Sequence, residues 1–388
     1  DDATAAAAKM AAIKYEGISG DITYDAQHNP VKKAAIIKIE GGKPTFFKFV
    51  APAGASEGGA AAPAAAGVSV PKAPGFKVKV GMAFPLSGDV KTFGESSRDG
   101  VLMAVEEAKA AGWDIETVLA DSKCDAQEAA NAANKLIAED GVKYIIGEVC
   151  SSASIPISQI VNEAKVLQIS PTSTNPAVTV NEDGSVKPYT FRACFLDPFQ
   201  GEVVAALAKE LGAAKAAVLF DVGNDYVKGL AEYFKASFEK MGGQVPVYEA
   251  YTKDDTDFSG ILGKVAAANV DVIFLPDYYN KNNLIAAQIK EKGIKATLLG
   301  GDGWDSPELQ FDLFEGGYFS NHYSPADPRP LVQNFVSSYQ AKYGAVPDAL
   351  ATLAYDAAKI LFQSISEAGV DDATAAAAKM AAIKYEGI

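Results

Sequence analysis

The stretch YIIGEVCSSASIPISQIVNEAKVLQIS, residues 144–170, contains one complete strand–helix–strand unit. A short apolar run, Tyr144 to Gly147, is followed by an amphipathic segment from Ala153 to Val166 and by a second apolar run from Leu167 to Ser170. Short apolar runs separated by helical segments are typical of parallel sheets, because parallel neighbours need a crossover connection. The stretch therefore predicts a doubly wound α/β fold.

The same alternation continues on both sides of this stretch. Apolar runs that predict strands occur at residues 76–84, 115–120, 216–220, 245–251, 272–275 and 297–299. Segments that predict helices occupy residues 93–111, 126–139, 198–211, 226–241, 258–267, 282–292, 331–343 and 349–367. The units fall into one series before Pro198 and one after it, and 388 residues with 48% hydrophobic side chains can fill two cores. We predict two doubly wound parallel-sheet lobes.

Composition and element order predict the domain boundaries. Lobe 1 is expected to comprise residues 76–195 and 321–370, and lobe 2 residues 196–320. Residues 19–50 are expected to add a hinge strand and a hairpin to lobe 2. Residues 51–75 are rich in Ala, Gly and Pro and nearly free of large side chains, which predicts a flexible linker. The chain would cross between the lobes three times, which favours a three-stranded hinge.

The two ends of the chain carry the same segment, DDATAAAAKMAAIKYEGI, at residues 1–18 and again at residues 371–388. Natural repeats keep a pattern but diverge in sequence, so a duplication without any difference indicates an engineered chain. Val370 leads into one copy and Ser19 continues from the other, so joining position 388 to Ser19 restores one continuous sequence. We predict a circular permutant whose terminal helix is supplied at both ends.

Each copy of the duplicated segment is expected to form an Ala-rich helix, and the two copies would compete for one docking position. We predict that only one copy packs against the body, because a free helix of this length is marginally stable in water. The expected state is a monomer. Exchange of the helix between molecules would instead give a swapped oligomer.

Charge and motif content exclude several classes of function. A formal net charge of −14 argues against a nucleic-acid partner, which needs clustered Lys and Arg. No run approaches the roughly 20 apolar residues of a membrane-spanning helix, so no membrane insertion is expected. The two histidines, His28 and His322, are distant in sequence from each other and from the cysteines, so no metal site is expected. The sequence contains no GxSxG, no P-loop and no GxGxxG after a strand, so we expect neither an enzyme nor a bound cofactor.

Hydroxyl side chains follow two strands of lobe 1, at the edge where parallel sheets bind ligands. Ser151 and Ser152 come after the strand at residues 144–147, and their hydroxyls together with the free N–H groups of a helix N-terminus suit a carboxylate. Thr172, Ser173 and Thr174 follow the strand at residues 167–170. Both groups have an alternative interpretation, since serine commonly caps helices and hydroxyl-rich loops are commonly solvated.

Carboxylates and aromatic residues follow the strands of lobe 2, in DVGNDY at 221–226, PDYYN at 276–280 and GGDGWD at 300–305. Asp302 can pair with an ammonium group while Tyr226 and Tyr278 shield it from water. Aspartate in a Gly-rich turn is also ordinary turn chemistry. Anion-binding groups on one lobe and cation-binding groups on the other predict a zwitterion, a small amino acid, held across the cleft.

Six motifs carry a resemblance to a known family: KVGMAFPLSGDVKTFGES, YIIGEVCSSAS, ISPTSTNP, FRACFLDPFQG, DYVKGLA and LLGGDGWD. With them the chain resembles the periplasmic solute-binding proteins of amino-acid ABC transporters, of the leucine/isoleucine/valine-binding type, which have a type I periplasmic-binding fold. The resemblance covers nearly everything except the linker. It implies a non-catalytic protein that closes around its ligand by hinge motion and docks on a transporter permease. A sensory ligand-binding domain for amino acids or small amides is the alternative, because such domains share this fold.

The resemblance assigns roles to particular residues. In the family, the residues at the positions of Ser151 and Thr174 bind the ligand carboxylate, together with backbone groups at the position of Thr172. The acidic residue at the position of Asp302 binds the α-ammonium group. The aromatic residue at the position of Phe93 closes over the side-chain pocket.

The remaining residues of the implied site include departures from the family pattern. Tyr226 and Tyr278 match second-lobe aromatics, whereas Thr172 and Ser173 replace small apolar residues and make the implied site more polar. Asp302 is one methylene shorter than the glutamate usual in branched-chain binders. Asp277, beside Tyr278, is an extra carboxylate that could favour a more cationic ligand or could face solvent, and we expect it to face solvent. Trp304 and Leu350 also stand where the family commonly has other residues, and Cys194 is expected to be a buried hydrophobe.

The cysteines help to predict the cellular compartment of the protein. Cys124 and Cys150 flank one helix and the strand after it, so they could meet, and they match the family's cysteine pair, which implies a disulfide. A disulfide implies an oxidising compartment, and the family is periplasmic or extracytoplasmic. The linker at residues 51–75 resembles the spacer that follows a lipid-modified cysteine, although no such cysteine precedes it, so the parent protein is expected to be exported and no anchor is expected here.

Overall fold

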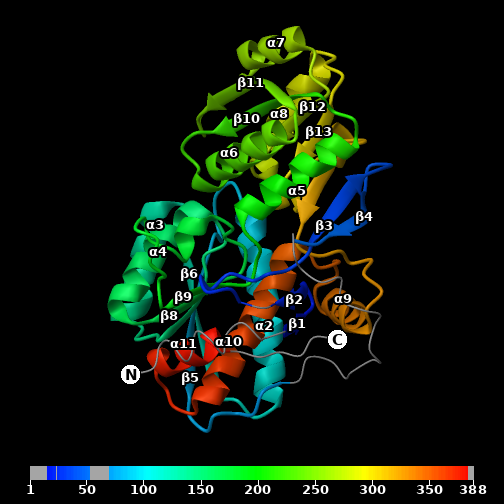
Figure 1. The fold of residues 1–388 in the computed structure, drawn as a ribbon. Coiled ribbons are helices and arrows are strands. Elements are labelled where there is room, and N and C mark those ends of the chain that lie inside the picture. The colour runs from blue at the N-terminus through cyan, green and yellow to red at the C-terminus, as the bar shows by residue number, and fades with distance from the viewer. Residues whose placement is uncertain (1–14, 23, 53–69, 383–388) are drawn as a thin grey trace. The chain divides into compact units, whose positions relative to one another are not determined.

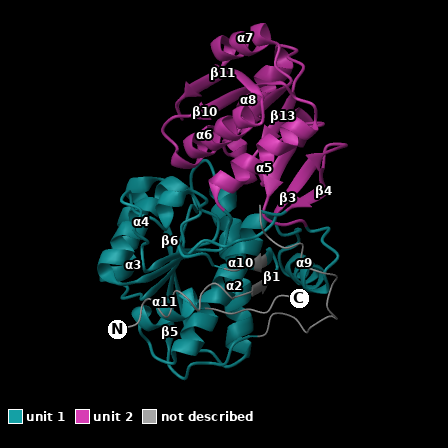
Figure 2. Ribbon diagram, viewed as in Figure 1, with its two compact units in different colours: residues 1–33, 51–195, 325–388 teal, residues 34–50, 196–324 magenta. Residues whose placement is uncertain are grey.

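The computed structural model describes residues 15–22, 24–52 and 70–382, and the chain divides into two compact units (Figure 2). Unit 1 comprises residues 1–33, 51–195 and 325–388. Unit 2 comprises residues 34–50 and 196–324. Each unit is therefore assembled from segments that are distant in sequence.

Unit 1 contains a five-stranded parallel sheet in the order β6-β5-β7-β8-β9. The strands are β5 (Val78–Phe84), β6 (Ile115–Asp121), β7 (Tyr144–Gly147), β8 (Leu167–Ser170) and β9 (Thr190–Arg192). The helices are α2 (Lys91–Ala110), α3 (Ala126–Ala138), α4 (Ser151–Ala164), α9 (Pro330–Tyr343), α10 (Ala349–Ala368) and α11 (Ala373–Ala381). A short antiparallel hairpin, β1 (Tyr15–Gly17) with β2 (Gly20–Ile22), and the 3₁₀ turn η1 (Pro176–Val178) complete it.

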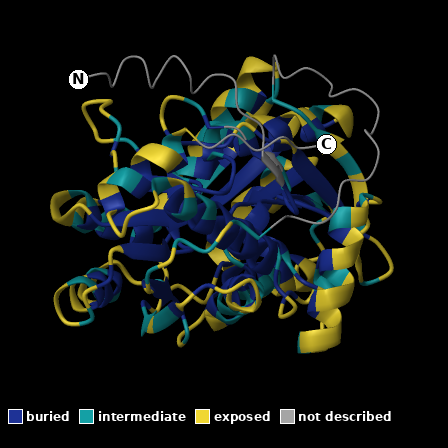
Figure 3. Cartoon of the chain, turned by 90° about the horizontal axis from the view of Figure 1, so that it is seen from below, coloured by how far each residue is buried: buried dark blue, intermediate teal, exposed yellow. Residues whose placement is uncertain are grey.

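Helices cover both faces of this sheet (Figure 1): α3 packs on α4, and α2 packs on α10. All residues of β7 and β8 are buried, as expected for parallel strands enclosed on two sides. Figure 3 shows the strands as a buried centre with exposed outer helix faces. The α2–α10 contact is close at Gly100, where a Cβ atom would lie 2.0 Å from the carbonyl oxygen of Ala351.

Unit 2 contains a seven-stranded mixed sheet in the order β11-β10-β12-β13-β14-β3-β4. The strands are β3 (Ala34–Ile39), β4 (Pro44–Val50), β10 (Lys215–Asp221), β11 (Gln244–Tyr251), β12 (Val272–Leu275), β13 (Thr297–Gly300) and β14 (Tyr318–Asn321). The helices are α5 (Asp197–Glu210), α6 (Asp225–Lys240), α7 (Ser259–Ala268) and α8 (Tyr279–Glu291), with the 3₁₀ turns η2 (Asp302–Trp304) and η3 (Phe311–Leu313). The first five strands in this order pair in parallel, whereas β14 pairs with β3, and β3 with β4, in antiparallel fashion.

The doubly wound α/β prediction is confirmed, and the structure differs from the sequence-based expectation in several places. Residues 19–33 lie in unit 1, although we expected all of 19–50 in lobe 2. Tyr318–Asn321 forms β14, which the sequence analysis did not predict, because pairing with β13 and β3 on its two sides outweighs its weak local pattern. Thr190–Arg192, which the sequence analysis also did not predict as a strand, forms the edge strand β9 by pairing with β8.

The duplicated segment is divided between a helix and a strand. In the second copy α11 ends at Ala381, and in the first copy Tyr15–Gly17 forms β1. The segment is therefore not helical throughout, and residues 1–14 and 383–388 lie outside the described part. Residues 53–69 of the predicted linker also lie outside it, whereas the end of the linker packs on unit 1, since the Trp113 indole N–H donates to the Pro71 carbonyl oxygen at 2.8 Å.

Candidate functional site

The loops after β7 and β8 form the hydroxyl-rich edge of unit 1. Ser151 is the first residue of α4, and its Oγ accepts a hydrogen bond from the Asn175 N–H at 3.2 Å. Thr174 is fully buried, and its hydroxyl has no hydrogen-bond partner among residues 15–22, 24–52 and 70–382. A buried hydroxyl without a partner is costly, so this group is well suited to a ligand.

Two more of the predicted hydroxyls, those of Thr172 and Ser173, have partners within the protein. Thr172 Oγ1 donates to the Val149 carbonyl oxygen at 3.0 Å. Ser173 Oγ lies 2.7 Å from Ser154 Oγ and donates to the Glu148 carbonyl oxygen at 3.1 Å. These side chains join the two loops to each other, whereas Ser151 Oγ acts as an acceptor and the Thr174 hydroxyl has no partner in the described part, so both can still donate to a ligand.

Arg192, which the sequence analysis missed, supports the loop after β8. Its side chain is fully buried at the end of β9, and its guanidinium donates to the carbonyl oxygens of Ser173 at 2.6 Å and Asn175 at 2.9 Å. It also donates to Thr179 Oγ1 at 3.1 Å. One rigid cation therefore fixes the backbone on both sides of Thr174. The FRACF motif was the available signal, but sequence alone did not show where this side chain points.

Glu148 is a second residue that the sequence analysis did not single out as functional. Its carboxylate is fully buried and accepts hydrogen bonds from Ser122 Oγ at 2.6 Å and from the Cys150 N–H. Burial raises the pKa of this carboxyl to about 8 against the lowering effect of the Ser122 hydrogen bond.

The predicted disulfide is confirmed: Cys124 and Cys150 are joined, with an S–S distance of 1.97 Å. The loops after β6 and β7 are therefore covalently linked.

Phe93 and Cys194 are both buried in unit 1. Phe93 lies in the first turn of α2 and is 4% exposed. Cys194 is a free, buried cysteine as expected, and its thiol also donates to the Ser173 carbonyl oxygen at 3.3 Å. It therefore adds a weak hydrogen bond to the loop that Arg192 holds.

The carboxylate edge of unit 2 is built around Asp302 in η2. Gln200 Nε2 donates to Asp302 Oδ1 at 2.7 Å, Tyr226 OH donates to the same oxygen at 2.8 Å, and His322 Nε2 lies 2.9 Å from Oδ2. Burial acts to raise the pKa of Asp302, but His322, Gln200 and Tyr226 together lower it below its ordinary value. The site thus keeps a buried carboxylate ionised. Gln200 and His322 were missed by sequence reasoning.

The predicted aromatic wall lies beside this carboxylate. The rings of Tyr226 and Tyr278 are stacked with their centroids 5.3 Å apart. Burial, together with the nearby Asp302 charge, raises the pKa of Tyr226 well above its ordinary value, so this phenol stays a hydrogen-bond donor. A side chain at Gly301 would crowd this site, because a Cβ atom would lie 2.7 Å from the Tyr226 hydroxyl oxygen and 2.8 Å from Leu230 Cδ2.

The expectation that Asp277 faces solvent is wrong. Its side chain is buried and accepts hydrogen bonds from Tyr251 OH at 2.7 Å and from the Tyr278 N–H at 2.7 Å. Burial raises the pKa of Asp277 to about 6 against the lowering effect of Tyr251. Hydrogen bonds from a distant strand hold it inside the unit and thereby position the backbone of Tyr278.

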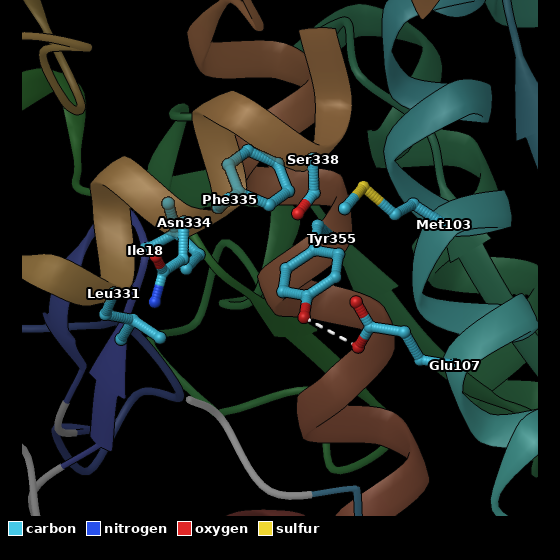
Figure 4. Close-up of a pocket in the computed structure, with 8 residues that line it drawn as sticks. All are labelled: Ile18, Met103, Glu107, Leu331, Asn334, Phe335, Ser338 and Tyr355. Atoms are coloured by element: carbon cyan, nitrogen blue, oxygen red, sulfur yellow. Dashed lines mark hydrogen bonds between the residues drawn. The ribbon is translucent and has the colours of Figure 1, made fainter. Parts of the chain in front are cut away.

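A separate cavity of about 280 Å³ lies within unit 1 and contains none of the residues predicted from sequence (Figure 4). Its lining residues are Ile18, Met103, Glu107, Leu331, Asn334, Phe335, Ser338 and Tyr355. The Glu107 carboxylate accepts from Tyr355 OH at 2.8 Å and pairs with Lys359 at 2.9 Å. The one carboxylate in the lining is therefore already neutralised within the protein.

The described residues contain no group of three or more His, Cys, Asp or Glu side chains that could hold a metal ion. None of the helices in the described part has both the length and the apolar character needed to span a membrane.

Comparison with known proteins identifies the family. A family model described as periplasmic binding protein matches residues 77–388. The chain belongs to the periplasmic binding protein family. A Brucella melitensis relative named Leu/Ile/Val-binding protein homolog 3 is 32% identical over 310 residues, which cover 78% of this chain and 82% of that protein. A Pseudomonas aeruginosa relative named leucine-, isoleucine-, valine-, threonine- and alanine-binding protein is 28% identical over 316 residues, covering 80% of this chain and 83% of that protein.

Solved structures agree on the type I periplasmic-binding fold. The leucine binding protein LivK from Thermotoga maritima is 38% identical, with a TM-score of 0.74 over 78% of this chain and 87% of that one. LivJ from Streptococcus pneumoniae, solved in complex with isoleucine, is 29% identical, with a TM-score of 0.71 over 79% of this chain and 88% of that one. These relatives are binding proteins and not enzymes. This agrees with the prediction that the chain is non-catalytic.

Proposed function

We propose that this periplasmic binding protein binds a small amino acid outside the cytoplasm and delivers it to an ABC transporter. The observation that carries the proposal is Asp302, a buried carboxylate that three neighbouring side chains keep ionised. Gln200 and Tyr226 are neutral donors, and His322 carries a charge only when it is protonated. An α-ammonium group would add a permanent counter-charge and a charge-assisted hydrogen bond to this carboxylate, so the site favours a cationic partner. The relatives named for leucine, isoleucine and valine, and the structure solved with isoleucine, support an aliphatic amino acid.

The opposite end of the ligand is assigned to unit 1. Ser151, Thr174 and the backbone at Thr172 would bind the carboxylate, and the positive N-terminal end of α4 would add to its stabilisation. The partnerless buried hydroxyl of Thr174 supports this role. Ser173 would act by positioning the loop, since its hydroxyl is bonded to Ser154 and Glu148.

The side chains around the ammonium group and the apolar part of the ligand complete the proposal. Tyr226 and Tyr278 would shield Asp302 from water, and Phe93 would cover the ligand side chain. The mechanism is closure of the two units around the ligand, in which binding shifts an open–closed equilibrium by its differential affinity for the closed state.

We further infer that the chain is an engineered circular permutant of such a protein. Three observations support this: the family match begins only at residue 77, residues 34–50 complete the sheet of unit 2 by pairing with β14, and residues 1–18 recur unchanged at 371–388. A natural-order parent would carry residues 19–50 after the duplicated segment. The parent would be an exported protein, with a lipid-modified cysteine before the spacer now at residues 51–75, that docks as a monomer on its transporter permease.

A thermal-shift screen over the proteinogenic amino acids tests the proposed function. A ligand that binds only the folded state raises the melting temperature by mass action, so at least one aliphatic amino acid should raise it and should be recovered chemically unchanged. Asp302→Ala should abolish the shift, whereas Asp254→Asn, at an exposed position of the same unit, should retain it. If no amino acid shifts the melting temperature of well-folded protein, the proposal is wrong.

A further inference from the structure

The helix α11 occupies a defined seat on unit 1. Ala376 and Met380 are fully buried and Ala373 and Ala377 nearly so, at spacings of three and four residues that place them on one face of the helix. This face packs on α10 and lies beside β8. We call the surface that receives it the α11 seat.

Polar groups cap the start of α11 and join it to the seat. Asp372 caps the helix by accepting from the Ala375 N–H at 2.8 Å. Asp371 pairs with Lys143 at 2.5 Å, and Thr374 Oγ1 lies 2.9 Å from Tyr189 OH. The seat therefore recognises a short helical peptide by its acidic start, one hydroxyl and a stripe of small side chains ending in methionine.

Every one of these recognised side chains occurs a second time in the chain. Asp371, Thr374 and Met380 have identical counterparts in Asp1, Thr4 and Met10, and the alanines between them are repeated in order. A seat that recognises side chains cannot distinguish Ala373–Ala381 from residues 3–11.

The first copy is tethered to the same helix that carries the seat. The N–H groups of Ile18 and Ser19 donate to the Asp356 carboxylate at 3.0 and 2.9 Å, and Asp356 belongs to α10. Arg329 also donates to the Ile18 carbonyl oxygen at 3.1 Å. Only residues 12–14 separate residues 3–11 from Tyr15, the start of β1. This tether makes docking of the first copy on the seat an intramolecular step.

We propose that the α11 seat is an exchangeable peptide-binding site that accepts either Ala373–Ala381 or residues 3–11 of the same chain. When residues 3–11 occupy the seat, the first copy runs continuously from the seat into β1, and residues 371–388 become an accessible peptide at the end of the chain. Because the two occupants have identical side chains, their relative populations depend on the two tethers and not on the contacts made in the seat.

Substitution of the buried methionine in each copy tests the proposal in the full-length chain. Met380→Asp and Met10→Asp should each change the melting temperature by less than about 1 °C, because the intact copy fills the seat. The double variant should lower the melting temperature by about 5 °C or more, because it buries a charge or leaves the seat empty. The matched control is Ala8→Asp with Ala378→Asp, since Ala378 is exposed on α11, and it should leave the melting temperature close to that of the parent.

Hydrogen exchange gives a second readout that does not depend on stability. In the Met380→Asp variant, amide protection should move from residues 373–381 to residues 3–11, and in the Met10→Asp variant it should stay on residues 373–381. If Met380→Asp alone is as damaging as the double variant, the first copy cannot use the seat and the proposal is overturned. Additive effects of the two substitutions would also overturn it, because they indicate two independent seats. A concentration-dependent dimer in the Met380→Asp variant would show that the seat is filled by a second chain, which contradicts intramolecular exchange.

Discussion

Replacement of Glu148 by glutamine should change how the stability of unit 1 depends on pH. The carboxyl is fully buried, and burial raises its pKa to about 8 from an ordinary value of 4.5. Between these two pH values the folded protein holds a proton that the unfolded chain has lost, so raising the pH favours unfolding. Each pH unit in this interval lowers the free energy of unfolding by about 1.4 kcal/mol, which gives at most about 5 kcal/mol over the whole interval.

Other buried groups, among them Asp277 and His28, titrate in part of the same range. Burial raises the pKa of Asp277 to about 6, which adds a fall in stability that is complete near pH 6. Burial lowers the pKa of His28, so the folded protein releases this proton before the unfolded chain does, and stability rises with pH up to about 6.5. The difference between parent and variant removes both contributions, because Glu148→Gln leaves these residues unchanged.

The assay is urea denaturation at pH 6, 7 and 8 with the disulfide intact. The free energy of unfolding of Glu148→Gln, relative to the parent, should increase by about 1 kcal/mol per pH unit. Glu139→Gln, at an exposed position of the same unit, should show a difference that does not vary with pH. A pH-independent difference for Glu148→Gln as well would refute the reasoning, because it would mean that the buried carboxyl ionises near its ordinary pKa.

Three further predictions concern packing, the disulfide and the loop at Thr174. Gly100→Ala should lower the free energy of unfolding by about 1–3 kcal/mol in chemical denaturation, because its Cβ would lie 2.0 Å from the Ala351 carbonyl oxygen; Gly263→Ala, which has open space around it, should not be destabilising. Replacing Cys124 and Cys150 by serine should lower the free energy of unfolding by about 3 kcal/mol, and a reducing agent should destabilise the parent but not this variant; equal sensitivity of both to reductant would contradict this. Arg192→Met removes the donors to the Ser173 and Asn175 carbonyl oxygens, so it should weaken amino-acid binding in calorimetry by about tenfold or more. Unchanged affinity would mean that Arg192 does not position the Thr174 loop.

The strands and helices of both units could be predicted because their signals are local. The runs at residues 144–147 and 167–170 coincide with β7 and β8 as observed, since both are short, apolar and bounded by helical segments. β14 could not be predicted this way, because Tyr318–Asn321 is a strand only through pairing with β13 and with β3, which lies almost 300 positions earlier in the sequence. Its stability is a property of the sheet and not of its own four residues.

The residues of the candidate site also divide into those that a local sequence signal could select and those that only the folded structure brings together. Ser151, Thr174 and Asp302 could be selected because each follows a predicted strand, where parallel sheets bind ligands. Gln200 and His322 could not, because they reach Asp302 from α5 and from the end of β14, and no spacing in the sequence brings them together. Asp277 was misassigned for a related reason, since its partner Tyr251 is contributed by β11.

Calorimetric titration with one amino acid and its two blocked forms tests the central claim most directly. The ligand is the amino acid that gives the largest thermal shift, and it is compared with its N-acetyl derivative and its carboxamide. The account predicts one binding site per chain for the free amino acid and at least about tenfold weaker binding for each blocked form, because each loses one charge-assisted interaction. Equal affinity for all three would contradict recognition of the ammonium group by Asp302 and of the carboxylate by Ser151 and Thr174.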